Sequence, residues 1–231
     1  MSSVAPSKQM ISQLYIEEAI GEHPRVLEIQ HQHPHLRVTR CRHYGEIFNR
    51  KAQHFRLQKR LPSLLLARKE GVKVLPTPVG YGVGSDRNFY FAHALNCLYD
   101  CQYCFLQGLY HSANYVVFVN FEEFFSDIAQ LTQKYRNEKP TFFSGYDGDS
   151  LAFDRWTNFS REALDFFTTL PEATLELRTK SIGIGPLLSR EPLDNVIVAY
   201  TLSPDAVARS VERGAPPLSA RLRALKRLQE A

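Results

Sequence analysis

The stretch that decides the fold runs Asn96-Cys97-Leu98-Tyr99-Asp100-Cys101-Gln102-Tyr103-Cys104-Phe105-Leu106. Its three cysteines follow the spacing C-x3-C-x2-C, and the chain contains one other cysteine, Cys41, far upstream. Iron–sulfur clusters held by protein ligands alone usually use four cysteines. Three thiolates on one short loop can hold three irons of a four-iron cluster, and the fourth iron then stays open to another ligand.

An open iron is what radical chemistry with S-adenosylmethionine (SAM) needs. The open iron takes the amino and carboxylate groups of SAM, and an electron from the cluster breaks a C–S bond and releases a 5′-deoxyadenosyl radical. We therefore predict that Cys97, Cys101 and Cys104 bind a [4Fe–4S] cluster, and that SAM is the second cofactor.

Other uses of these cysteines have to be weighed against the cluster. A Cys3His zinc site is one alternative, because His93 and His111 flank the loop. Zinc knuckles usually pair two C-x2-C arms, however, and only one arm is present. Cysteines that only pack in the core are a second alternative. A disulfide is disfavoured, because residues 1–9 lack the apolar stretch of a signal peptide and cytosolic thiols stay reduced.

Composition indicates a cytoplasmic protein with one sizeable core. The chain has 231 residues and is 44% hydrophobic, and no apolar stretch approaches the roughly 20 residues needed to cross a membrane. Residues 36–75 hold only two acids against a basic set of Arg37, Arg40, Arg42, Arg50, Lys51, Arg56, Lys59, Arg60, Arg68, Lys69 and Lys73. With aromatics interleaved, this segment is suited to a nucleic-acid surface, with cations on phosphates and rings on bases. The alternative is a solvated helix face whose aromatics point into the core.

The pattern of elements changes near residue 88. Upstream we expect a strand at residues 36–41 and helices at 15–22, 46–59 and 61–69. Downstream, strands at 89–93, 115–120, 141–144, 174–179 and 196–202 alternate with helices at 121–135, 160–170 and 218–231. Such alternation predicts an α/β fold, a partial open parallel β/α barrel of about five strands. We expect an N-terminal α+β extension over residues 1–87 and the barrel over 88–231, with the cysteine loop, residues 144–147, Lys180 and residues 202–203 converging at the strand ends.

Motifs along nearly the whole chain resemble the spore photoproduct lyase family of radical SAM proteins. The matching stretches are Tyr44-Gly45-Glu46-Ile47-Phe48-Asn49, Asn96-Cys97 through Gly108, Phe118-Val119-Asn120, Asp149-Ser150-Leu151-Ala152, Arg178-Thr179-Lys180-Ser181, Thr201-Leu202-Ser203-Pro204 and residues 212–224. The resemblance implies a partial barrel behind an N-terminal extension. It also implies a lyase of the DNA-repair type, whose founding activity is radical repair of a UV-induced thymine dimer.

The resemblance also implies roles for individual residues. Cys97, Cys101 and Cys104 would be the cluster ligands. The SAM contacts would be the adenine neighbour Tyr103, the amino-group contacts Ser144 and Gly145, the carboxylate or ribose contact Lys180, and Thr201, whose hydroxyl points into the same cleft. The implied partners are SAM, a reductant such as flavodoxin or ferredoxin, and DNA or RNA, with no membrane.

This chain departs from the family pattern in two ways. The founding lyases carry a hydrogen-donor cysteine after the third strand, whereas Tyr146 takes that place here as the candidate catalytic residue, and Phe105 replaces a common tyrosine. The family's last strand and DNA-facing elements would also lie beyond Ala231, which predicts an open sheet edge and marginal stability of this chain alone. Two further readings stay open: a nucleic-acid-binding protein with a structural metal site, and a truncated inactive homologue.

Overall fold

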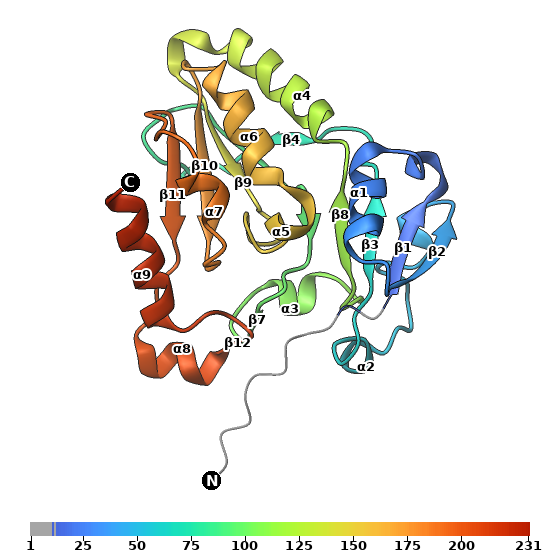
Figure 1. Cartoon of the computed structure of the whole chain (residues 1–231). Coiled ribbons are helices and arrows are strands. Elements are labelled where there is room, and N and C mark those ends of the chain that lie inside the picture. The colour runs from blue at the N-terminus through green and yellow to red at the C-terminus, as the bar shows by residue number, and fades with distance from the viewer. Residues whose placement is uncertain (1–10, 12) are drawn as a thin grey trace.

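The computed structural model describes residue 11 and residues 13–231, so the prediction about a signal peptide in residues 1–9 lies outside the described part. Within it the chain forms two five-stranded sheets and a two-stranded ribbon (Figure 1). The predicted α/β class with mainly parallel strands is confirmed. Both sheets are open in the described part, and the partial barrel therefore stays a prediction.

The first sheet combines three strands of the N-terminal third with two strands that follow residue 88. Its strand order is β2 (Arg37–Cys41), β1 (Gln13–Glu17), β3 (Leu64–Ala67), β8 (Tyr115–Phe118) and β6 (Ala94–Leu95), and only β6 is antiparallel to its neighbour. Every residue of β3 and β8 is buried, because short runs of leucine and valine suit strands that are covered on both faces. The helix predicted at residues 61–69 was therefore wrong.

The helix predicted at residues 15–22 was wrong as well. Those residues form β1 and the 3-10 turn η1 (Glu18–Ile20), and the helix α1 (Pro24–Gln32) begins after them. Pro24 occupies the first turn of α1, where a missing N–H costs nothing. The side chain of His23 accepts a hydrogen bond from the Arg25 N–H at 3.3 Å and caps the helix start.

The second sheet carries the strand and helix alternation predicted from residue 88 onward. Its strand order is β11 (Val196–Tyr200), β10 (Thr174–Thr179), β9 (Thr141–Ser144), β5 (Asn88–Phe91) and β4 (Val74–Pro76), with only β4 antiparallel. The strand predicted at 115–120 is β8 and pairs with β3 in the first sheet instead. In the described part no strand pairs with the outer side of β11, which is half-buried rather than covered on both faces.

The remaining elements connect and cover the sheets. The helix α4 (Phe121–Lys134) lies where it was predicted, while the helix expected at 46–59 consists only of η2 (Tyr44–Glu46) and α2 (Phe55–Gln58). In the described residues no helix combines the length and the apolar character needed to cross a membrane. The other helices are α3 (Leu106–Leu109), η3 (Arg136–Glu138), α5 (Asp154–Thr157), α6 (Phe159–Thr168), α7 (Gly185–Leu188), α8 (Asp205–Val211) and α9 (Leu218–Gln229). The two-stranded ribbon consists of β7 (Asp100–Cys101) and β12 (Glu212–Arg213).

Strand pairing within each sheet crosses the predicted boundary at residue 88. β3 pairs with β8, and β4 pairs with β5, so hydrogen bonds join the stretches on either side. Arg25 of α1 donates to the Glu162 carboxylate of α6 at 3.0 Å and lies over the Phe121 ring at 4.2 Å. The division into residues 1–87 and 88–231 therefore stays a prediction about folding units.

His93 lies where the two sheets meet and is almost fully buried. Its ring stacks on Phe159 with centroids 3.8 Å apart, meets Phe121 edge-on, and makes a hydrogen bond to the backbone of Ser150. Burial lowers the pKa of His93 to about 3 and outweighs that hydrogen bond. The imidazole is therefore neutral in the folded protein at physiological pH.

We expect this burial to make the protein less stable in acid. An unfolded histidine titrates near pH ~6.5, so between that pH and about 3 only the unfolded chain takes up the proton. The stabilisation that comes from keeping His93 neutral is complete above the pKa of the unfolded histidine and is lost as the pH falls below it. Going from about pH 7 to about pH 5, the protein should lose about 2 kcal/mol more unfolding free energy than His93→Phe, which keeps the stacking and removes the titration. Urea unfolding of both proteins at the two pH values measures this; equal losses would contradict it.

Candidate functional site

The cysteine loop lies at one edge of the molecule, where it contains β7, leads into α3 and pairs with β12 (Figure 1). It begins at Asn96, a buried residue with a left-handed backbone (φ 64°). The Asn96 amide donates to the carbonyl oxygens of Ser112 and Asn114 at 2.8 and 2.7 Å. These two bonds hold the start of the loop against the segment that leads into β8.

The three thiols of the loop are free and interact electrostatically with one another. Burial raises the pKa of Cys97 well above its usual value, and the nearby Asp149 carboxylate adds to the effect. Burial also raises the pKa of Cys101, and the Lys180 ammonium opposes that rise. Cys41, by contrast, lies on β2 with Glu17 and Glu46 as charged neighbours, and burial raises its pKa to about 11. The structure therefore groups three of the four cysteines.

The donor set fits a multi-iron cluster better than one zinc ion. Zinc needs four ligands around a single ion, but in the described residues no three His, Cys, Asp or Glu side chains converge on one point. A four-iron cluster needs no such convergence, because each thiolate binds a different iron. His93 is enclosed by aromatic rings and His111 is exposed, so neither histidine completes a zinc site.

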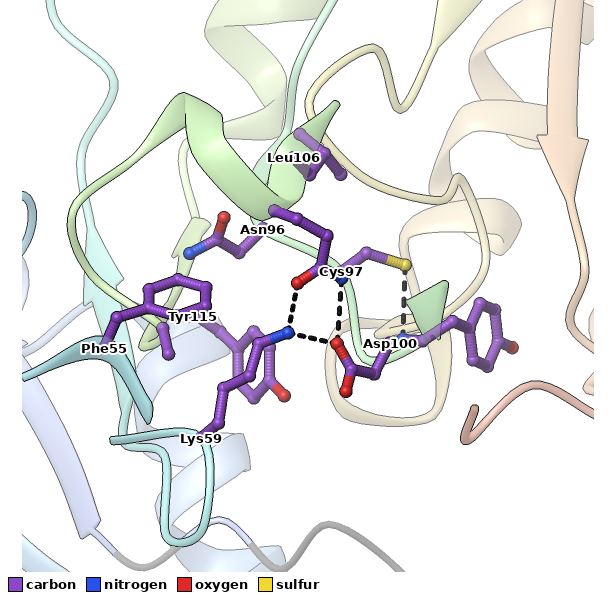
Figure 2. Close-up of a pocket in the computed structure, with 10 residues that line it drawn as sticks. Phe55, Lys59, Asn96, Cys97, Asp100, Leu106 and Tyr115 are labelled. Carbon is purple, nitrogen blue, oxygen red and sulfur yellow. Dashed lines mark hydrogen bonds and ion pairs between the residues drawn. The ribbon is translucent and has the colours of Figure 1, made fainter. Parts of the chain in front are cut away.

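Lys59 braces the loop from the basic segment, as Figure 2 shows. Its ammonium donates to the Asp100 carboxylate and to the Gln107 side-chain oxygen. The Gln107 amide in turn donates to Asp100 at 2.8 Å and to the Cys101 carbonyl at 3.1 Å. The cavity beside these residues has a volume of about 20 Å³, which suits a water molecule and not SAM. It is part of the loop's support.

Lys180 and Tyr103 come together from β10 and from the cysteine loop. The Lys180 ammonium lies 5.7 Å from the centre of the Tyr103 ring. The backbone at Lys180 is held by Asp149, whose carboxylate accepts from the Lys180 N–H and the Thr179 hydroxyl, each at 2.7 Å. Burial outweighs these bonds and raises the pKa of Asp149. A cation, an aromatic ring and the thiol of Cys101 thus share one site.

Gly145 and Ser144 shape the backbone at the end of β9. Gly145 has φ 72°, and a Cβ at this position would come within 2.6 Å of the Ser150 nitrogen, so only glycine fits without strain. The Ser144 hydroxyl lies within hydrogen-bond distance of two acceptors for its single proton, the Ser150 hydroxyl at 2.7 Å and the Glu176 carbonyl at 3.1 Å. These bonds give Ser144 a structural task at the position predicted for a SAM contact.

Tyr146 belongs to a group of rings at the same strand ends. Its side chain is 46% exposed and stacks on Tyr90 with centroids 4.1 Å apart, and the Phe105 ring centre lies 6.3 Å away. Thr201 is half-buried just after β11, and its N–H donates to the Thr179 carbonyl at 3.0 Å. That bond keeps the ends of β10 and β11 in register, next to Lys180.

Sequence reasoning assigned no role at this site to three residues that organise it, Lys59, Asp149 and Glu212, although Lys59 was part of the predicted basic segment. Asp149 and Glu212 lie inside stretches that carried the family resemblance, so the sequence did contain a signal for them. Their tasks depend on contacts with distant segments, such as Asp149 with Thr179, which local patterns do not reveal.

Most Lys and Arg side chains of the basic segment are exposed, whereas its Tyr and Phe rings are buried or half-buried. Phe48 is buried and packs on Tyr44, whose ring meets Phe118 edge-on at 5.5 Å. These rings belong to the core, which favours the solvated-face alternative for the aromatics. Seven guanidinium or ammonium side chains upstream of residue 61 are exposed: Arg37, Arg40, Arg42, Arg50, Lys51, Arg56 and Arg60.

The family assignment follows from comparison with known proteins. The family model for spore photoproduct lyase matches residues 86–231, which is more than half of the chain. The chain belongs to the spore photoproduct lyase family. Two curated members of the family are similar to it. The chain is 26% identical over 143 residues to the spore photoproduct lyase of Bacillus subtilis (strain 168), and 24% identical over 139 residues to that of Geobacillus sp. (strain Y412MC61).

Solved spore photoproduct lyase structures share the fold. One variant, with bound AdoMet and dinucleoside spore photoproduct, aligns with a TM-score of 0.83 at 16% identity over 96% of this chain. A complex with dinucleoside spore photoproduct aligns with a TM-score of 0.82 at 17% identity. The chain covers 65% of each of these solved chains and 41% of the curated relatives.

Proposed function

We propose that this member of the spore photoproduct lyase family is a radical SAM enzyme. Cys97, Cys101 and Cys104 would hold a [4Fe–4S] cluster, with SAM beside it. The observation that carries the proposal is the approach of Lys180, from the end of β10, to Tyr103 and Cys101 of the cysteine loop, because these are two distant segments of the chain. When bound, the cluster and SAM supply one-electron radical chemistry.

The chain's own residues would bind and orient the reactants. The Lys180 ammonium would pair with the SAM carboxylate or bond the ribose, and the Tyr103 ring would pack against the adenine. Gly145 allows the β9 end to turn sharply beside them. Thr201 would present its hydroxyl to the same cleft, while Ser144 would keep the turn in shape. We assign these tasks to residues 88–231 and a supporting, basic role to residues 1–87.

We place the substrate beside Tyr146 and take it to be a nucleic acid. Solved relatives are described with dinucleoside spore photoproduct bound, and the exposed cations of this chain suit a phosphate backbone. Residues 145–150 contain no cysteine. Tyr146 is then the candidate hydrogen-atom donor, and its exposed, stacked ring leaves the hydroxyl accessible. A flavodoxin or ferredoxin would supply the electron.

Anaerobic reconstitution with iron and sulfide tests the proposed function. The protein should turn brown with the broad visible absorbance of an iron–sulfur protein, and it should cleave SAM when dithionite is added. A protein that binds iron and never cleaves SAM would be an inactive homologue. A protein that takes up one zinc ion and no iron would be a module with a structural metal site.

Lys180→Ala is expected to weaken SAM binding about tenfold, because one hydrogen bond to a charged group is lost, and to leave the iron content unchanged. Equilibrium dialysis of labelled SAM with reconstituted protein measures both. The matched control is Lys226→Ala, a 73%-exposed lysine on α9. Unchanged SAM affinity in Lys180→Ala would make Lys180 a solvated residue at a strand end.

Binding of a DNA or RNA oligonucleotide should weaken as salt rises. Each phosphate neutralised contributes about −0.9 to the slope of log K against log salt, so three contacts predict about a 40-fold loss between roughly 50 and 200 mM salt. Fluorescence anisotropy with a labelled oligonucleotide measures the slope. Replacing Arg37, Arg42 and Arg56 with glutamine should flatten it, and replacing Arg223 and Arg227 of α9 should not. A slope near zero would leave the basic segment as a solvated surface.

A further inference from the structure

The carboxylate of Glu212 is the centre of a buried network below the cysteine loop. Its Oε1 atom accepts hydrogen bonds from the hydroxyls of Tyr103 and of Ser203, the second at 2.9 Å. Its Oε2 atom accepts from the guanidinium of Arg221. The side chains of Arg221 and Glu212 are 1% and 0% exposed. Both carboxylate oxygens of Glu212 therefore accept hydrogen bonds from side chains of the protein.

Backbone pairing brings Glu212 to the loop independently of its side chain. The ribbon of β12 and β7 places Glu212 opposite Cys101 and Arg213 opposite Asp100. Next to it, the Gln102 N–H donates to the Val211 carbonyl at 2.8 Å. The middle of the cysteine loop is thus one strand of a two-stranded ribbon whose partner is the segment that leads into α9.

Arg221 anchors this segment to the strand ends. From α9 its guanidinium donates to the Thr201 carbonyl at 3.1 Å and to the Pro216 carbonyl at 2.8 Å, besides its bond to Glu212. Burial alone would raise the pKa of Glu212, but the bonds from Tyr103, Arg221 and Ser203 outweigh it and hold that pKa below its usual value. The carboxylate is therefore ionised and fixed in place.

The Tyr103 ring depends on this carboxylate for its orientation. The ring is 57% exposed, and at its hydroxyl end it is held by the bond to Glu212. Its face meets the Lys180 ammonium at 5.7 Å. Without the anchored hydroxyl, an exposed ring on a loop is free to take other rotamers and to leave Lys180.

We propose that Glu212 is a positioning residue of the cofactor site, which orients the Tyr103 ring against Lys180 and clamps the cysteine loop through its pairing with Cys101. The proposal rests on the proposed function, in which Tyr103 and Lys180 contact SAM. It makes SAM affinity depend on a carboxylate that itself never touches SAM.

The first test uses the protein without iron, and so does not depend on the proposed function. Hydrogen exchange of the amides of residues 99–107 should be about tenfold faster in Glu212→Gln and in Tyr103→Phe, since Gln replaces one acceptor oxygen of the network by an NH2 donor and Phe has no hydroxyl to donate. Glu162→Gln, which weakens the ion pair with Arg25 far from the loop, should leave exchange unchanged. Unchanged exchange in both loop variants would overturn the proposal, and Tyr103→Phe decides the question if Glu212→Gln does not fold.

The second test is a double-mutant cycle for SAM affinity in the reconstituted protein. If Glu212 acts through Tyr103, Glu212→Gln and Tyr103→Phe should each weaken SAM binding several-fold. The double variant should then bind SAM as tightly as whichever single variant binds it less tightly. Additive losses would overturn the proposal, because Glu212 would then act by another route. If the unchanged protein binds no SAM, the proposed function fails, and the exchange measurement alone decides whether Glu212 positions the loop.

Discussion

Replacing Cys97, Cys101 or Cys104 with alanine is expected to abolish iron binding after anaerobic reconstitution. Each thiolate would hold a different iron, and the described part of the chain offers no nearby thiol as a substitute, because Cys41 lies on β2 with Glu17 and Glu46 around it. A cluster with two protein ligands loses the support that keeps it on the loop. Iron and sulfide assays together with visible absorbance measure the loss.

Cys41→Ala is the matched control, because it also removes one buried thiol. Its iron content should equal that of the unchanged protein. If Cys41→Ala removed the iron while one loop variant retained it, three ligands and an open iron would be the wrong description of the site. Circular dichroism of every variant checks that the fold survives.

Arg221→Met is expected to lower the free energy of unfolding by about 3–5 kcal/mol, because it leaves the Glu212 carboxylate buried without its cation. The variant also removes the donors to the carbonyls of Thr201 and Pro216. Such a loss is a large part of the stability of a typical domain, about 5–15 kcal/mol. Equilibrium unfolding in urea, followed by circular dichroism, measures it.

Lys226→Met on the same helix is the control for Arg221→Met. Lys226 and Glu230 form an exposed pair one turn apart, so this change should cost no more than about 0.5 kcal/mol. Equal effects of the two substitutions would mean that the Arg221–Glu212 pair is open to water in solution. In that case the ribbon of β7 and β12 would be held by its backbone alone.

Local patterns predicted the second half of the fold well. The strand β10, the strongly apolar strand β11, and the helix α4 with acids in its first turn lie within a few residues of their predicted bounds. The buried face of α4 is visible in its own sequence, and all three elements follow connections typical of parallel α/β units. Their positions required no knowledge of distant contacts.

The first half shows where such patterns are insufficient. A leucine run such as β3 fits a buried helix or a buried strand equally well, and only its position between β1 and β8 makes it a strand. The membership of β8 in the first sheet is also non-local, because its own residues look like any parallel strand. The run of Lys and Arg residues with interleaved aromatics likewise gave no sign that Phe48 is buried.

The site was predictable only at its most specific motif. The spacing of the cysteines identified the three thiols that the structure brings together, and the family resemblance pointed to Lys180 and Tyr103. The ligand roles themselves stay predictions. The supports of the loop could not be predicted, because Lys59 lies 41 residues from its partner Asp100 and meets the loop only in the folded chain.

The pairing of Tyr103 with Glu212 has a consequence for how the protein is made. The two residues are 109 positions apart, and Glu212 is the later one. At about 5–20 residues per second, the ribosome adds Glu212 about 5–20 s after Tyr103. During that interval the loop has neither its ribbon partner nor its buried ion pair. The loop can therefore take its folded form only after Glu212 and Arg221 of α9 have been synthesised.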